Sequence, residues 1–91
     1  MIRKTIITVV GSDTVGIIAK VCTYLSEHNA NILDISQTIV QGYFNMMMIV
    51  DTANIDLDFT QLSRELKTLG EKIGVEIRCQ LSDIFDGMHR I

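Results

Sequence analysis

The chain has 91 residues, 47% of them hydrophobic, and a formal net charge of −3. This length fits one domain, and because so small a globule has little interior, we expect part of its apolar surface to contact a partner. Lys and Arg do not cluster, which disfavours nucleic acid and anionic membranes as partners. No apolar stretch is long enough to cross a bilayer and no signal peptide is evident, so we expect a cytoplasmic protein.

The first predicted elements are a strand and a helix. Residues 2–10 are rich in β-branched side chains on both faces, which indicates a central strand. The Gly11–Gly16 segment then predicts a turn, with Asp13 as N-cap of a helix over about residues 14–28. Asn29 or Asn31 can take the left-handed conformation that ends such a helix. Cys22 in this helix and Cys79 are expected to be reduced thiols.

A β-hairpin is expected next. Residues 32–41 alternate, with Leu33, Ile35 and Ile39 on one face and polar side chains on the other. Gln41-Gly42 marks a short turn, and residues 43–51 form the returning strand. Its three consecutive methionines, Met46, Met47 and Met48, are typical of core and interface filling rather than of a metal site.

The last third of the chain begins with a polar connector, 51–58. A helix follows, whose apolar residues recur at spacings of three and four: Phe59, Leu62, Leu66, Leu69 and Ile73. Gly70 and Gly74 blur or end it. Residues 75–82 alternate in the manner of an edge strand that is solvated on one face. The tail, 83–91, places Ile84, Phe85, Met88 and Ile91 on one side of a short amphipathic helix that must dock on something to be stable.

This order predicts an α+β, ferredoxin-like βαββαβ fold, a four-stranded antiparallel sheet with two helices on one face. We expect one domain over 1–91, with a core over 1–82 and the C-terminal tail over 83–91. Because the first three strands are apolar on both faces, the other side of the sheet needs a cover, either the tail or a second subunit.

Several classes of protein that adopt this fold depend on residues that this chain lacks. The first strand has no aromatic residue for stacking on RNA bases. The first loop has neither the CxxC of a copper carrier nor a nearby arginine for phosphate. His28 and His89 lack metal-ligand spacing, and Asp51, Asp56 and Asp58 lack the pattern of a calcium loop. We therefore predict no catalytic residue, no metal and no cofactor.

Two segments carry a resemblance. The turn Gly11-Ser12-Asp13-Thr14-Val15-Gly16-Ile17 and the strand entry Asn31-Ile32-Leu33-Asp34-Ile35 resemble an ACT domain. The Ile35–Thr38 segment, the methionine-rich strand and the ending Ile-Phe-Asp-Gly-Met-His-Arg-Ile resemble a group of small free-standing bacterial and archaeal ACT proteins. The resemblance extends over almost the whole chain.

The resemblance implies a regulatory module that forms a homodimer or higher homo-oligomer and often binds an amino acid at the interface. The ligand would lie between the first loop of one subunit and the second strand of another. Carried over by position, the ligand-binding residues are Gly11, Ser12, Asp13, Thr14, Val15 and Gly16 in the loop, and Asn31, Ile32 and Asp34 on the facing strand.

Free amides at a helix start suit a carboxylate, and a carboxylate or amide side chain suits an ammonium group. Structural roles remain open for the same residues. Asp13 could be an N-cap alone, Asn31 a turn residue alone, and Gly16 a means of packing helix on sheet.

The sequence therefore leaves three functions. The first is sensing of a small ligand, an amino acid on the family resemblance. The second is a protein–protein interaction module that docks on a metabolic enzyme or regulator without a ligand of its own. The third, an enzyme, is disfavoured because no nucleophile–base pair or carboxylate dyad stands out.

Overall fold

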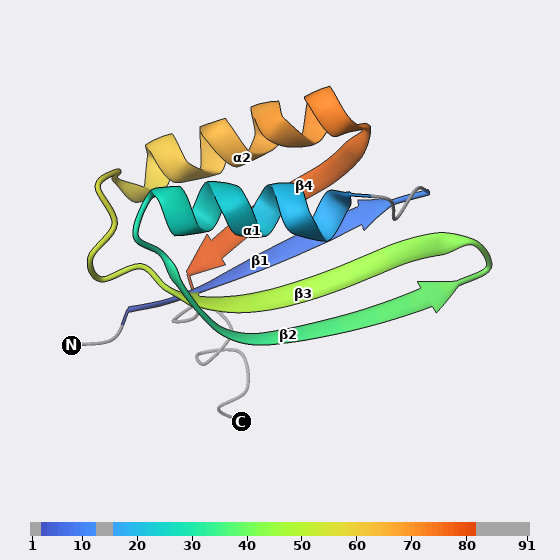
Figure 1. Ribbon diagram of the computed structural model, residues 1–91, viewed down its shortest axis with the longest axis horizontal. Coiled ribbons are helices and arrows are strands. Elements are labelled where there is room, and N and C mark those ends of the chain that lie inside the picture. Colours follow the sequence, from blue (N-terminus) through green and yellow to red (C-terminus); the bar gives the residue numbers. More distant parts are fainter. Residues whose placement is uncertain (1–2, 13–15, 82–91) are drawn as a thin grey trace.

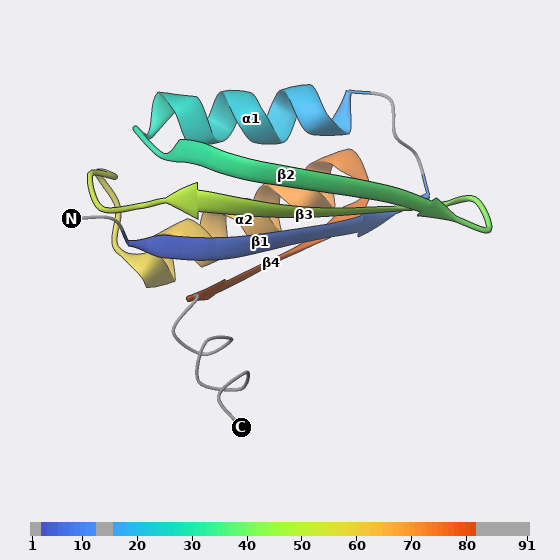
Figure 2. The ribbon, with the colours of Figure 1, turned by 90° about the horizontal axis from the view of Figure 1, so that it is seen from below.

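A computed structural model describes residues 3–12 and 16–81 of the chain. The elements in chain order are β1 (Lys4–Gly11), α1 (Ile17–Glu27), β2 (Asn31–Val40), β3 (Tyr43–Asp51), α2 (Phe59–Ile73) and β4 (Val75–Leu81). The strands form one antiparallel sheet in the order β2-β3-β1-β4, and both helices lie on one of its faces (Figures 1 and 2). The predicted ferredoxin-like fold is confirmed, with β1 in a central position.

The core lies between this sheet and the helices. Alternate residues of the inner strands, such as Ile7 and Met48, turn toward the helices and are fully buried. Each helix contributes one apolar stripe, with Val21 and Leu25 from α1 and Leu66 from α2 among its members. Period-two alternation in the strands and the helical stripes thus converge on one apolar layer.

The two helices begin differently. The N-cap of α1 is Gly16, with φ of 76°, and among the described residues no side chain caps this helix. The prediction that Asp13 caps a helix starting near residue 14 is therefore wrong; Asp13 itself lies outside the described residues. Helix α2 has a full capping box, in which Asp58 accepts from the backbone N–H of Gln61 at 2.7 Å and Gln61 accepts from that of Asp58.

The turns follow the predicted residue types. Asn29, with φ of 65°, takes the left-handed conformation after α1, whereas Asn31 is the first residue of β2. Gln41 and Gly42, with φ of 50° and 83°, form the two-residue hairpin turn between β2 and β3. Gly74, with φ of 79°, ends α2.

Three sequence expectations need correction. Gly11 belongs to β1 rather than to the turn. A bulge between Ile32 and Asp34 interrupts the alternation of β2, so Leu33 is not in phase with Ile35. Gly70 neither blurs nor ends α2 but lies buried inside it.

The remaining expectations agree with the structure or lie outside it. β4 is an edge strand, since it pairs with β1 alone among the described strands. Cys22 and Cys79 are free and half-buried. The predicted tail helix over 83–91 lies outside the described residues.

Candidate functional site

The first half of the predicted site follows β1. Gly11 ends the strand so close to Val75 that a Cβ at this position would collide with the Val75 side chain. Ser12 is exposed, and Gly16 is the N-cap of α1. Asp13, Thr14 and Val15 lie outside the described residues.

The start of α1 offers hydrogen-bond donors. The first bond within the helix runs from the Lys20 N–H to the Gly16 carbonyl, at 3.0 Å. The amides before Lys20 therefore have no acceptor within the helix, and the first turn carries no acidic side chain. Together with the positive end of the helix dipole, this arrangement favours an anionic group such as a carboxylate.

The second half of the site is the start of β2. Asn31 is exposed and pairs with Asp51 on β3, so it lies on the sheet face away from the helices. Ile32 turns toward the helices and packs against the core. Beyond the bulge, Asp34 again lies on the far face, and its Oδ1 accepts from the Ile35 N–H at 2.9 Å.

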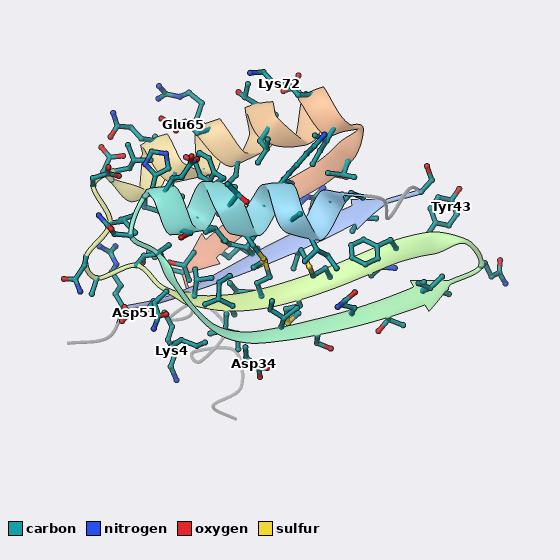
Figure 3. The ribbon with its side chains drawn as sticks, in the orientation of Figure 1. Lys4, Asp34, Tyr43, Asp51, Glu65 and Lys72 are labelled. Atoms are coloured by element: carbon teal, nitrogen blue, oxygen red, sulfur yellow. The ribbon has the colours of Figure 1, made fainter. Side chains whose placement is uncertain are left out.

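A single chain does not bring these halves together. Gly11 pairs with Phe44 and Asn31 pairs with Asp51, so the halves lie at opposite ends of the sheet. Phe44 and Asp51 are seven residues apart on one strand, which corresponds to about 24 Å at ~3.4 Å per residue. Figure 3 shows this separation, with Tyr43 at the loop end and Asp51 at the other.

The free edge of β2 supplies an apolar surface between the two ends. Ile35 and Ile39 face the helix side of the sheet, yet they remain 36% and 67% exposed because α1 does not reach over them. Leu33 in the bulge is 41% exposed. An edge strand with unpaired backbone groups and exposed aliphatic side chains is a surface for pairing with another strand.

A polar cluster that the sequence did not predict joins the helices. The His28 Nδ1 lies 2.8 Å from an Asp56 carboxylate oxygen, and the Tyr24 hydroxyl donates to Glu65 at 2.6 Å. The ring centroids of Tyr24 and His28 are 4.5 Å apart. Burial and the Glu65 hydrogen bond raise the pKa of Tyr24 above its usual value. Tyr24 and His28 are 41 and 28 residues from their partners Glu65 and Asp56 and share no motif with them, so only the fold could reveal the cluster.

The described part of the chain has a groove that lies away from the predicted site. A groove of about 600 Å³ runs between α2 and β4, where its lining includes Lys67, Glu71 and Arg78. No predicted site residue lines it. Within residues 3–12 and 16–81, no cluster of His, Cys, Asp or Glu could hold a metal ion, and no helix is long and apolar enough to span a membrane.

A family match gives the class of this domain, a small regulatory ligand-binding domain. Residues 3–80 match the family model of the ACT domain. The chain belongs to the ACT domain family, whose members are regulatory, bind small ligands and often dimerise.

Named proteins show the same relationship. UPF0237 protein BL1209.1 of Bifidobacterium longum is 68% identical over 98% of this chain and 99% of its own length. An ACT domain protein from Streptococcus pneumoniae superposes with a TM-score of 0.84, at 42% identity, over 93% of this chain and 96% of that one. A formyltetrahydrofolate deformylase from Pseudomonas syringae shares the fold, with a TM-score of 0.81 and 24% identity, but this chain spans only 28% of it.

Proposed function

We propose that this protein senses an amino acid at the interface of a homodimer and has no catalytic activity of its own. The observation that carries the proposal is the separation of the two halves of the predicted site, about 24 Å apart along one sheet. Such a site can be completed only by a second copy.

Pairing through β2 would complete it. If two copies of β2 run antiparallel side by side, the Asn31 end of one strand lies beside the Val40 end of the other. The Val40 end is also the end at which β1 leads toward α1 (Figure 1). Each dimer would then hold two equivalent sites, each made of one loop and the partner's strand start.

The chemistry of the two halves suits a zwitterion. The uncapped amides of α1 would bind the carboxylate. Asn31 and Asp34, both exposed at the start of β2, would supply oxygen atoms for the ammonium group. The aliphatic edge residues Leu33 and Ile35 would contact the amino-acid side chain or the partner strand.

Calorimetry or thermal-shift screening against the twenty amino acids tests the proposal. A ligand present at a hundred times its Kd should stabilise the protein by about 2.7 kcal/mol. Ser12→Asp should weaken binding by repelling the carboxylate while leaving the dimer intact, and Ser12→Ala is the matched control.

A second set of variants links the site to dimerisation. Ile35→Lys with Ile39→Lys should place charges on the pairing edge and abolish both the dimer and ligand binding, whereas Thr68→Lys on α2 should change neither. A monomeric wild-type protein in light scattering would refute the interface site. A dimer that binds no amino acid would favour the interaction module instead.

A further inference from the structure

The sheet face away from the helices carries a narrow apolar stripe. Ile6 and Val10 of β1 and Met47 and Ile49 of β3 lie on this face, and we call these four residues the apolar stripe. Ile6 pairs directly with Ile49 and is only 8% exposed, while Met47 and Val10 are 44% and 42% exposed. Thr8, which pairs with Met47, and Asn45, which pairs with Val10, lie on the same face. None of the four belongs to the core cluster on the helix side.

Polar residues border the stripe on both edge strands. On β2 the neighbours on this face are Asp34, Ser36 and Thr38, and on β4 they are Glu76, Arg78 and Gln80. The stripe therefore lies on the two central strands, about 4.8 Å apart, with Thr8 and Asn45 interspersed among its apolar residues. From Ile6 to Val10 it spans five residues, whose four steps along the strand amount to about 13 Å.

These dimensions suit one short helix better than a second sheet. A helix with its side chains is about 10–12 Å across, so it would cover two strands and leave the polar borders in water. A stable dimer buries roughly 800 Å² on each partner, far more than four aliphatic side chains provide. The second copy is better accommodated at the β2 edge.

The chain itself supplies a segment of the right size beside the stripe. β4 ends at Leu81, which pairs with Thr5, the residue before Ile6. Ten residues follow, and as a helix they would extend about 15 Å. Four of them are large and apolar and share one helical side: Ile84, Phe85, Met88 and Ile91.

The segment and the sheet face both carry charged residues. Its first half contains Asp83 and Asp86, and its last residues include Arg90. At the Ile6 end of the sheet, Lys4 is exposed, and at the Val10 end Glu76 pairs with Val10 across β1 and β4. Lys4 shares its end of this face with Asp34 and Asp51, and Glu76 is already paired with Arg78 at 2.8 Å, so the direction of the tail follows from where β4 ends and not from these charges.

A relative of this protein also has most of the C-terminal tail. The match to the ACT domain family ends at residue 80. The alignment with the Bifidobacterium longum relative nevertheless includes 89 of the 91 residues and 99% of that protein. It can omit at most two residues here, so it includes most of the tail.

We propose that residues 83–91 form a short amphipathic helix that docks in cis along the apolar stripe, running from Ile6 toward Val10. The tail would convert the two-layer domain into three layers and close this sheet face, so that self-association is directed to the β2 edge.

Engineered disulfide formation tests the docking. In a background with Cys22→Ala and Cys79→Ala, Met47→Cys is combined with Met88→Cys. The control combines Met88→Cys with Lys20→Cys, an exposed position on α1 at the helix face. After oxidation, thiol counting, mass spectrometry and non-reducing gels report the product. We expect most of the Met47 pair, and little of the control pair, to form a link within one chain.

Other products would overturn the proposal. Covalent dimers of the Met47 pair would mean that a second copy or an exchanged tail occupies the stripe. Two free thiols in a folded protein, as judged by circular dichroism, would mean that the tail does not dock there.

A second measurement does not depend on the engineered cysteines. Ile84→Ser with Met88→Ser should release the tail and raise the emission of an apolar dye severalfold, whereas His89→Ser should leave it unchanged. Equal emission from both variants would also overturn the proposal.

Discussion

Replacing Gly70 by alanine tests how closely α2 packs on β4. In an exposed helix this change stabilises by up to about 1 kcal/mol, because glycine is a poor helix former. Here a Cβ would lie 2.7 Å from the Val75 carbonyl oxygen and 3.1 Å from the Ile77 Cγ1. The carbonyl belongs to the backbone of β4, which is fixed by pairing with β1, so the helix must move instead.

The expected outcome is a net loss of stability. Overpacking costs about 1–3 kcal/mol, which exceeds the gain in helix propensity, so Gly70→Ala should destabilise by roughly 1 kcal/mol and at most about 2. For a domain of this size each kcal/mol lowers Tm by about 4–8 °C. Urea and thermal unfolding followed by circular dichroism measure the change.

Gly74 is the matched control. Its φ is positive and nothing lies within 4 Å of the position that a Cβ would take, so substitution there meets backbone strain without a collision. Gly74→Asn should recover part of the loss caused by Gly74→Ala, because asparagine tolerates the left-handed conformation, whereas Gly70→Asn should be worse than Gly70→Ala. A Gly70→Ala protein as stable as the wild type would refute the packing explanation.

Three further outcomes follow from local contacts. Asp58→Ala removes the capping box of α2 and should cost about 1 kcal/mol in denaturant unfolding, while Thr60→Ala beside it should cost little. Hydrogen bonds from the Ala53 and Arg3 amides lower the pKa of Asp51. Its contribution to stability is therefore present above the unfolded pKa and is lost as pH falls through the folded value. Asp51→Asn should flatten the fall of the unfolding free energy at acid pH, and an unchanged fall would contradict the assignment. Burial raises the pKa of Cys79 to about 12 and also raises that of Cys22. At pH 8, Cys79 should have roughly a thousandfold less thiolate than a thiol of pKa 9, and a thiol reagent should label it correspondingly slowly. Rapid labelling of Cys79 in folded protein would contradict its burial.

The sequence predicted the fold well because its periodic patterns are strong. The alternation of residues 43–51 and the helical stripe ending at Ile73 match β3 and α2. The prediction from sequence was wrong at the start of α1 and in β2. Asp13 is a good capping residue, yet the N-cap of α1 is Gly16, three residues further along the chain. The bulge after Ile32 also left no trace in the apolar pattern.

The candidate site was predictable only in part. The motif resemblance predicted both segments and assigned them to different subunits, whereas their separation by the length of the sheet depends on the strand pairing, which hydrophobic periodicity does not encode. The cluster of Tyr24, His28 and Glu65 likewise depends on how α1 and α2 pack. The exposure of Ile39 could not be foreseen either, because it depends on how far α1 extends over the sheet.

The central position of β1 has a consequence for synthesis of the chain. Ile6 pairs with Ile49 on one side and with Gln80 on the other, so its partners emerge from the ribosome 43 and 74 residues later. Until then the β-branched segment from Ile6 to Val10 has no sheet to join. Pairings this distant in sequence close slowly, so we expect the domain to complete its folding only after β4 has been made. The first strand made is thus the one most in need of protection from aggregation.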